Sequence, residues 1–179
     1  MVSIPTKLKD VNFYVDGRDW MGKGEIKLPD ISHKTQDVSP MGIAGTLSLP
    51  NVGDLEPLKG EIKLLTVWKD SLTVCLNPKQ AVMLDVRGVI QVMNPQTGLM
   101  EDKPVVVKMR AHFTKTGIGN WKPGEGDQPA LEYSAVYMKI TVDGQDVFEY
   151  DPFAYKLIVN GQDLLADTRA ALGKIGGAK

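Results

Sequence analysis

The sequence predicts an all-β protein with minor α-content, built as an antiparallel β-barrel or sandwich with one flanking helix, a short C-terminal helix and long loops. Apolar and polar residues alternate with a period of two over several stretches, as they do in strands with one buried face. Eighteen glycines and eleven prolines among 179 residues favour many turns over a few long helices. A chain of this length is expected to form one domain, residues 1–179.

The longest alternating stretches predict an antiparallel hairpin. From 81 to 93 the even positions are mainly apolar, and from 104 to 113 the odd positions are apolar. Between them, Asn94–Gly98 is a typical turn sequence. Further strands are expected at 11–15, 24–28, 31–38, 58–64, 136–142 and 154–159.

Three similar turn sequences, "YVDGRDW", "ITVDGQDV" and "IVNGQDL", punctuate the chain. Asp-Gly and Asn-Gly are typical of type I′ hairpin turns, because both central residues of that turn have positive φ. Calcium binding is the alternative, since each motif gathers oxygen-bearing side chains. The alternating ligands of a calcium loop are missing, however. We therefore interpret the three motifs as turns, the third leading into a helix.

Two segments have helical spacing. The first, Val67–Leu76, ends before Pro78, and its apolar face consists of Trp68, Leu72, Cys75 and Leu76. The second is Asp163–Leu172, with a stripe formed by Leu164, Leu165, Thr168 and Leu172. Asn160 or Asp163 is the candidate N-cap of this helix, and Gly173 is expected to end it.

Two segments fit neither period: 39–54, and the glycine-rich stretch 114–128 around Trp121. Irregular loops longer than about 12–15 residues are uncommon in compact domains unless they have a function. We expect 39–54 to be a long loop, residues 1–10 an N-terminal arm, and 174–179 a frayed tail.

Composition excludes several classes of protein. A net charge of −1 gives no overall field that would attract nucleic acid or an anionic membrane. A single cysteine cannot form an internal disulfide and is typical of a reducing compartment. The opening residues do not resemble a signal peptide, and apolar runs stay below the ~18 residues of a membrane span. We expect a soluble protein made in the cytoplasm, without stable membrane binding.

Candidate catalytic residues are few. His33 and His112 are far apart in sequence, and each lies in a strand-like run. Cys75 lies on the apolar face of the first predicted helix and is interpreted as a buried hydrophobe. The sequence contains neither a G-x-S-x-G nucleophile motif nor the spacing of a P-loop. We predict no catalytic, cofactor-binding or metal-binding residues, and a protein that is not an enzyme.

The two ends of the chain resemble a known family. The N-terminal segment is "PTKLKDVNFYVDGRDWMGKGEIKLPDISHKTQDV", followed by a Met-Gly loop. The C-terminal segment is "EYSAVYMKITVDGQDVFEYDPFAYKLIVNGQDLLADTRAALG". In order and spacing, both resemble major tail tube proteins of contractile-tailed bacteriophages and R-type bacteriocins. The resemblance covers 5–45 and 132–173; between them only the pattern of strand, helix and hairpin is similar.

This resemblance implies a structural subunit. Six copies would close into a ring, and rings would stack into a hollow tube inside a contractile sheath, which conducts DNA or punctures a target envelope. The implied partners are other copies of the chain, the sheath protein, the tape-measure protein, baseplate and tail-terminator proteins, and DNA as passing cargo. The implied place is a virion tail or bacteriocin particle, assembled in the cytoplasm of the bacterial host.

The resemblance also suggests a role for the charged strand faces. Neighbouring hairpins would pair edge to edge and close a large barrel, so that polar faces line its lumen. The candidate lumen-facing residues are Lys59, Glu61, Lys63, Asp85, Arg87, Gln91, Lys108 and Arg110. Their mixed charge would leave passing DNA with little net attraction, because phosphate contacts supply most non-specific affinity. The alternative is ordinary solvent exposure.

The long loop becomes a candidate inter-subunit contact. Its apolar residues have no evident core of their own to join: Met41, Ile43, Leu47 and Leu49. The alternative is a loop folded back onto its own subunit. Two other functions stay open: a tube subunit of a secretion or extracellular injection machine, and a monomeric β-barrel that binds a small apolar ligand in an interior cavity.

Overall fold

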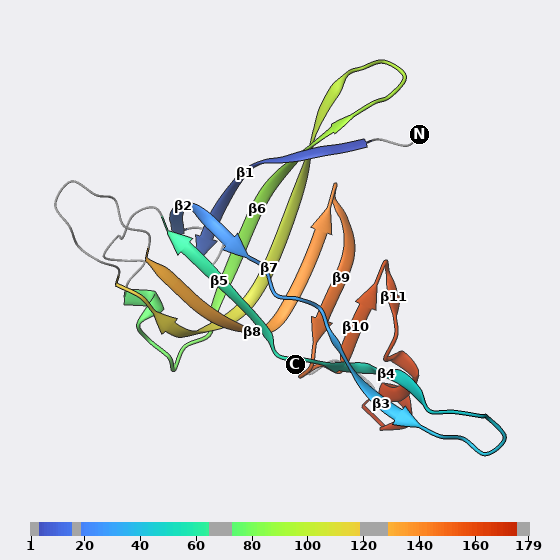
Figure 1. The fold of residues 1–179 in the computed structure, drawn as a ribbon. Helices are drawn as coiled ribbons and strands as arrows, with labels where there is room; N and C mark the ends of the chain where they lie inside the picture. Colours follow the sequence, from blue (N-terminus) through green and yellow to red (C-terminus); the bar gives the residue numbers. More distant parts are fainter. Residues whose placement is uncertain (1–3, 16–18, 65–72, 119–128, 175–179) are drawn as a thin grey trace.

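The computed structural model of the protein describes residues 4–15, 19–64, 73–118 and 129–174. These residues form mainly antiparallel strands and one assigned helix, α2 (Figure 1). The bounds are β1 Ile4–Val15, β2 Asp19–Lys27, β3 His33–Val38, β4 Leu47–Leu55, β5 Leu58–Leu64, β6 Val82–Met93, β7 Met100–Thr116, β8 Ala130–Val142, β9 Gln145–Asp151, β10 Lys156–Val159, β11 Gln162–Asp163 and α2 Ala166–Ala171. The prediction of an all-β fold with minor α-content is confirmed.

Strand β8 organises the larger sheet. One of its edges pairs with β7, from Val105↔Val142 to Thr116↔Leu131. Its other edge is shared, because β5 pairs with its first half and β9 with its second half. The pairings β8–β5–β2–β1–β6–β7 lead back to β8. Strands β9, β10 and β11 continue past this circuit, so the nine-stranded sheet as a whole is not closed into a barrel.

The core lies on one face of these strands. The side chains buried to the greatest extent are Phe13, Leu58, Ile62, Leu84, Met109, Leu131, Tyr133, Met138 and Leu157. On the hairpin, Val82, Leu84 and Val86 are buried from β6, as predicted for even positions. Val107 and Met109 are buried from β7, as predicted for odd positions. The period of two therefore identified the buried face of both strands.

The predicted hairpin turns are observed where the structure describes them. Asp143 and Gly144 have φ of 51° and 77°, and Asn160 and Gly161 have φ of 49° and 80°. Positive φ at both central residues is the conformation for which Asp-Gly and Asn-Gly were singled out. The third turn leads into β11 before the helix, rather than directly into it. The first motif, around residue 17, lies partly outside the described residues.

The β6–β7 hairpin extends beyond the rest of the sheet. Its turn is closed by hydrogen bonds from the Gly98 amide to the Asn94 carbonyl (2.8 Å) and from the Asn94 amide to the Leu99 carbonyl (2.9 Å). Beyond the last β7–β8 pair, Val105↔Val142, the only other strand paired with the hairpin is the first half of β1, which pairs with β6. We call this projection, residues 4–10 and 88–104, the arm (Figure 1). The N-terminal segment predicted as a separate arm, 1–10, is thus part of strand β1 from Ile4.

The prediction of an irregular loop over 39–54 is wrong for its second half. Leu47–Leu55 forms β4, which pairs with β3, and the connection is only 39–46. Pro50 and Gly53 break the alternating pattern in the sequence, but Pro50 is tolerated in a two-stranded sheet whose edges lie open. The base of this hairpin is anchored by buried Leu55, and its tip projects away from the body (Figure 1).

Helix α2 is shorter than predicted and buries less. The prediction of Asn160 or Asp163 as its N-cap is wrong, because the N-cap is Leu165, which makes no side-chain cap hydrogen bond. Asp163 lies two residues earlier, where its Oδ1 accepts a hydrogen bond from the Leu165 amide at 3.0 Å and its Oδ2 pairs with Arg169 at 2.8 Å. Burial raises the pKa of Asp163, but the hydrogen bonds and the arginine charge outweigh it and lower the pKa overall. Gly173, with φ of 66°, ends the helix as predicted. Of the predicted stripe, only Leu165 is buried, whereas Leu164 and Leu172 are exposed.

The other predicted helix and the glycine-rich loop are described only in part. Of the predicted helix 67–76, residues 73–75 are helical, and residues 67–72 lie outside the described residues. Residues 114–116 belong to β7, whereas 119–128 lie outside the described residues. Cys75 is buried, as predicted, and burial raises the pKa of its thiol to about 12.

We expect Cys75 to be unreactive toward a maleimide in the folded protein at pH 8. The thiolate is the reacting species, and a pKa of about 12 leaves almost none of it at that pH. In urea the thiol should react at the rate of an ordinary cysteine. Labelling can be followed by mass spectrometry; fast, complete labelling without denaturant would contradict the buried position.

Candidate assembly surfaces

The charged residues predicted on β5 and β7 lie on the outer face of the sheet. On β5, Lys59, Glu61 and Lys63 alternate with buried apolar residues. On β7, Lys108 and Arg110 are exposed and alternate with Val107 and Met109. Strand β8 pairs with both β5 and β7, so these side chains share one continuous face.

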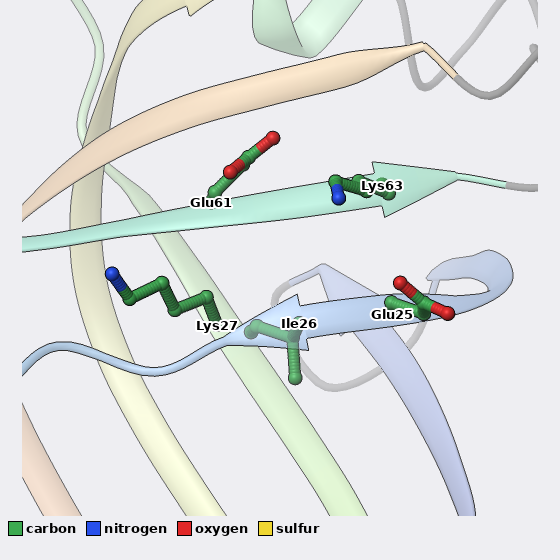
Figure 2. A pocket seen from close by; sticks show the side chains of 5 residues that line it. All are labelled: Glu25, Ile26, Lys27, Glu61 and Lys63. Atoms are coloured by element: carbon green, nitrogen blue, oxygen red, sulfur yellow. The ribbon is translucent and has the colours of Figure 1, made fainter.

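The β2–β5 part of this face has balanced charge. Figure 2 shows a shallow depression of about 180 Å³ lined by Glu25, Ile26, Lys27, Glu61 and Lys63. The strand register places Glu61 opposite Lys27, and Lys63 opposite Glu25. Opposite charges at cross-strand positions stabilise the pairing modestly. They also leave little net field to attract a polyanion.

Asp85 differs from the other members of the predicted set, because only 5% of its surface is exposed. Its Oδ2 lies 3.4 Å from Nη2 of Arg87. The guanidinium of Arg87 lies 4.8 Å from the ring centroid of Tyr14 on the neighbouring strand β1. Arg87 itself is exposed, so the surface presents the arginine and not the carboxylate.

Arg110 and the last member of the set, Gln91, lie in different surroundings. Arg110 lies 5.9 Å from the ring centroid of Tyr137 on β8. Gln91 is half-buried and belongs to the arm, where the register places it between Lys7 and Asp102. The predicted lumen set thus divides between the body of the sheet and the arm.

The apolar residues predicted as an inter-subunit contact are all exposed. Met41 is fully exposed, and Ile43, Leu47 and Leu49 each expose between 41% and 50% of their surface. Met41 and Ile43 lie in the connection of the β3–β4 hairpin, and Leu47 and Leu49 lie on β4. This hairpin and the arm project from opposite ends of the molecule (Figure 1).

The sequence analysis missed a second depression, of about 410 Å³, between β4, the β9–β10 turn and α2. Its lining includes Val52, Gly53, Tyr150, Tyr155 and Leu165, and we call it the aromatic depression. The available signal was a dense run of aromatic residues in "FEYDPFAY", residues 148–155. The walls come from distant parts of the chain, so spacing alone does not assemble them.

The structure brings no catalytic constellation together in the part of the chain that it describes. Within those residues, groups of three or more His, Cys, Asp or Glu side chains suited to a metal ion are absent. His33 is exposed on β3, and His112 is half-buried on β7, in the other sheet. Among the described residues, none of the helices has the length and apolarity to cross a membrane.

The protein is an antiparallel β-sheet with two oppositely directed projections, and both projections carry exposed apolar residues. This architecture is typical of a subunit that assembles with other copies or other proteins. Its polar outer face and its projecting elements offer surfaces for contact. The chain belongs to the phage tail tube protein FII family, whose sequence model matches residues 5–173. It is therefore a structural tail tube subunit, a component of a virion or particle tail. The family resemblance predicted from the two ends of the chain is confirmed.

Three solved structures resemble this chain at low sequence identity, and the first of them shares its fold. A chain from the cryo-EM structure of the sheath/tube terminator of an extracellular contractile injection system, PVC, in the extended state has a TM-score of 0.53 and 12% identity, covering 79% of this chain and 99% of its own. A chain from the PVC sheath-tube complex in the extended state has a TM-score of 0.47 and 14% sequence identity, and the match covers 74% of this chain and 87% of that one. A chain from the baseplate of the anti-feeding prophage has a TM-score of 0.49 and 16% sequence identity, and the match covers 78% of this chain and 97% of that one. A search of curated proteins found no match.

Proposed function

We propose that six copies of this tail tube subunit close into a ring and that the rings stack into a hollow tube inside a contractile sheath. The observation that carries the proposal is the exposure of apolar side chains on projecting elements, with Met41 fully exposed. Soluble monomers rarely present such residues together, and exposed apolar patches mark contact sites. The family of the chain supports the same proposal.

Open strand edges support ring closure. Among the described residues, the start of β1, 4–9, forms its backbone pairs with β6 on one side only. Residues 100–103 of β7 likewise form backbone pairs only with β6, whereas the Pro104 carbonyl already accepts a hydrogen bond from the Asp143 amide at 2.9 Å. An unpaired edge is a template for another strand. Pro5 lies on the first edge and Pro104 directly follows the second, and a proline limits indiscriminate pairing because it lacks an amide hydrogen.

The partners that we propose are the sheath, baseplate, tail-terminator and tape-measure proteins, with DNA as passing cargo. The printed descriptions of similar structures name a sheath/tube terminator, a sheath-tube complex and a baseplate. We further propose a phage tail or bacteriocin particle assembled in the host cytoplasm, and a subunit without catalytic activity. A tube subunit of an extracellular injection system is the second candidate, because a chain of such a system has the same fold.

Electron microscopy of the purified chain tests the proposed assembly. We expect hollow rods or stacked rings in negative stain, and material that sediments far faster than a 19.6 kDa monomer. Six-fold symmetry in class averages of end-on views would support the ring size. A chain that stays monomeric at high concentration would contradict the proposal.

We expect Glu61→Lys to slow DNA ejection while leaving the tubes intact. Glu61 is half-buried on the outer face, and its replacement would turn a balanced surface into a basic one in every copy. Phosphate contacts with added lysines retain DNA, and this attraction weakens steeply with salt. The measurement is the ejection rate of assembled particles at low and high salt.

The matched control is Glu56→Lys, the same charge change at an exposed residue between β4 and β5. It should leave ejection unchanged at both salt concentrations. Normal tubes with equal ejection rates for both variants would show that Glu61 does not face the lumen.

A further inference from the structure

We propose that the tip of the arm of one subunit, residues 94–101, seats in the aromatic depression of a second subunit. This inference deepens the proposed stacking and rests on it. Two surfaces on opposite ends of the same molecule would meet (Figure 1). Such a contact is heterologous, and its repetition propagates an open stack rather than a closed dimer.

The tip of the arm is a compact turn that presents two exposed apolar side chains among polar ones. Leu99 and Met100 expose 64% and 53% of their surface, although both belong to a well-formed turn and strand start. Leu8 of β1, also on the arm, is exposed as well. Nearby charges are compensated within the subunit: Lys9 pairs with Asp102 at 2.7 Å, and Lys103 pairs with Asp143. Docking the tip would therefore not bury these ions unpaired, which would be costly.

The aromatic depression is large enough to accept a side chain of a second subunit. Its volume, about 410 Å³, is in the range of pockets that enclose a small ligand or an anchoring side chain. One wall is fixed by close packing, because a Cβ on Gly53 would lie 2.7 Å from Cδ2 of Leu165. Gly53 also has φ of 88°, a conformation that other residues rarely adopt. A side chain at this position would narrow the depression.

The opposite wall is held by hydrogen bonds. Oδ1 of Asp151 accepts from the amides of Phe153 (3.0 Å) and Ala154 (3.1 Å), which shapes the β9–β10 turn. Tyr155 has φ of 50°, and its carbonyl accepts a hydrogen bond from Nη1 of Arg169 at 3.1 Å. A residue in this region persists only where its surroundings hold it, and such residues cluster at functional sites. The depression is thus preorganised, which lowers the entropic cost of docking.

Each surface carries one charge that could pair across the contact, and Asp54 in the lining of the depression is already paired with Lys34 at 2.9 Å. Glu101 is exposed and directly follows Met100 at the tip. Lys174 is exposed beside the depression, with its Nζ 3.6 Å from the ring centroid of Tyr155. With the tip seated, a carboxylate would approach an ammonium at the rim of an apolar contact. Opposite charges at a rim contribute mainly orientation and specificity.

Cross-linking in assembled tubes tests the contact directly. The variant combines Leu99→Cys at the tip with Val52→Cys at an exposed residue of the depression, and preformed tubes are treated with a short bismaleimide. The native Cys75 is buried and should not react. We expect a ladder of covalent oligomers in denaturing gels. Each single variant should give none, and neither should the control pairing Val52→Cys with Leu76→Cys, another exposed leucine.

Charge reversal provides the second measurement. Glu101→Lys and Lys174→Glu should each reduce the yield of sedimenting tubes, and combining them should restore most of it. Tubes that form without a ladder, or a combined variant no better than the single ones, would overturn the seating. If the unaltered chain forms neither rings nor tubes, the proposed function fails instead.

Discussion

Replacing Met41 and Ile43 together by aspartate is expected to leave a folded, soluble subunit that no longer polymerises. Both side chains are exposed in the connection between β3 and β4, so the subunit loses no core contact. In an assembled tube these residues would be covered, and burying two unpaired carboxylates there would cost several kcal/mol for each contact. Polymer yield is measured by sedimentation and negative stain, and folding by circular dichroism.

The matched control is Val147→Asp, an exposed apolar residue on β9 away from both projecting elements. It should leave polymer yield close to that of the unaltered chain. Substitution is preferable to removal of 41–49, because Leu47 and Leu49 belong to β4 and pair with Val38 and Gln36. Normal tubes from the Met41/Ile43 variant would show that this connection is not an inter-subunit contact.

The Tyr133→Ala substitution is expected to lower the free energy of unfolding by about 3–5 kcal/mol, the cost typical of truncating a large buried aromatic side chain. Tyr133 on β8 is 1% exposed. Its ring covers Gly60 so closely that a Cβ there would lie 2.4 Å from the Tyr133 oxygen. The hydroxyl donates to the carbonyl of Lys27 at 3.2 Å, so the side chain connects β8, β5 and β2.

Tyr133→Phe separates the two contributions. It keeps the ring and removes only the hydrogen bond, so about 1 kcal/mol is expected. Urea unfolding of the monomeric Met41/Ile43 variant as background would avoid interference from polymerisation. A loss below about 1 kcal/mol for Tyr133→Ala would contradict the packing described, since even a single lost hydrogen bond reaches that size.

Local pattern predicted the β6–β7 hairpin well, because in the body of the sheet every second residue from Val82 to Val86 and from Val107 to Phe113 is buried on one face. It failed at β4, where Pro50 and Gly53 read as a loop. This strand is stabilised by its pairing with β3 and by the packing of Gly53 on Leu165. Neither contact can be inferred from the strand's own residues.

Of the candidate assembly surfaces, the sequence predicted the exposed loop but neither the burial of Asp85 nor the aromatic depression. Exposure of the apolar residues around Met41 followed from the lack of any periodicity that would bury them. Burial of Asp85 did not follow, because the register places it opposite Tyr14 on β1, a strand distant in sequence, and Arg87 lies against both side chains. The aromatic depression escaped entirely, since β4, the β9–β10 turn and α2 meet only in the folded chain.

The arm is a continuation of strands that also build the body. Strands β6 and β7 pair without a register shift from Val82↔Ala111 to Met93↔Met100. A force applied at the tip therefore acts along the strands. The hydrogen bonds between β6 and β7 share this force, because sliding one strand past the other would break many of them at once. Bending the arm would instead strain the pairs where β8 stops accompanying β7. The arm is therefore stiffest along its own strands.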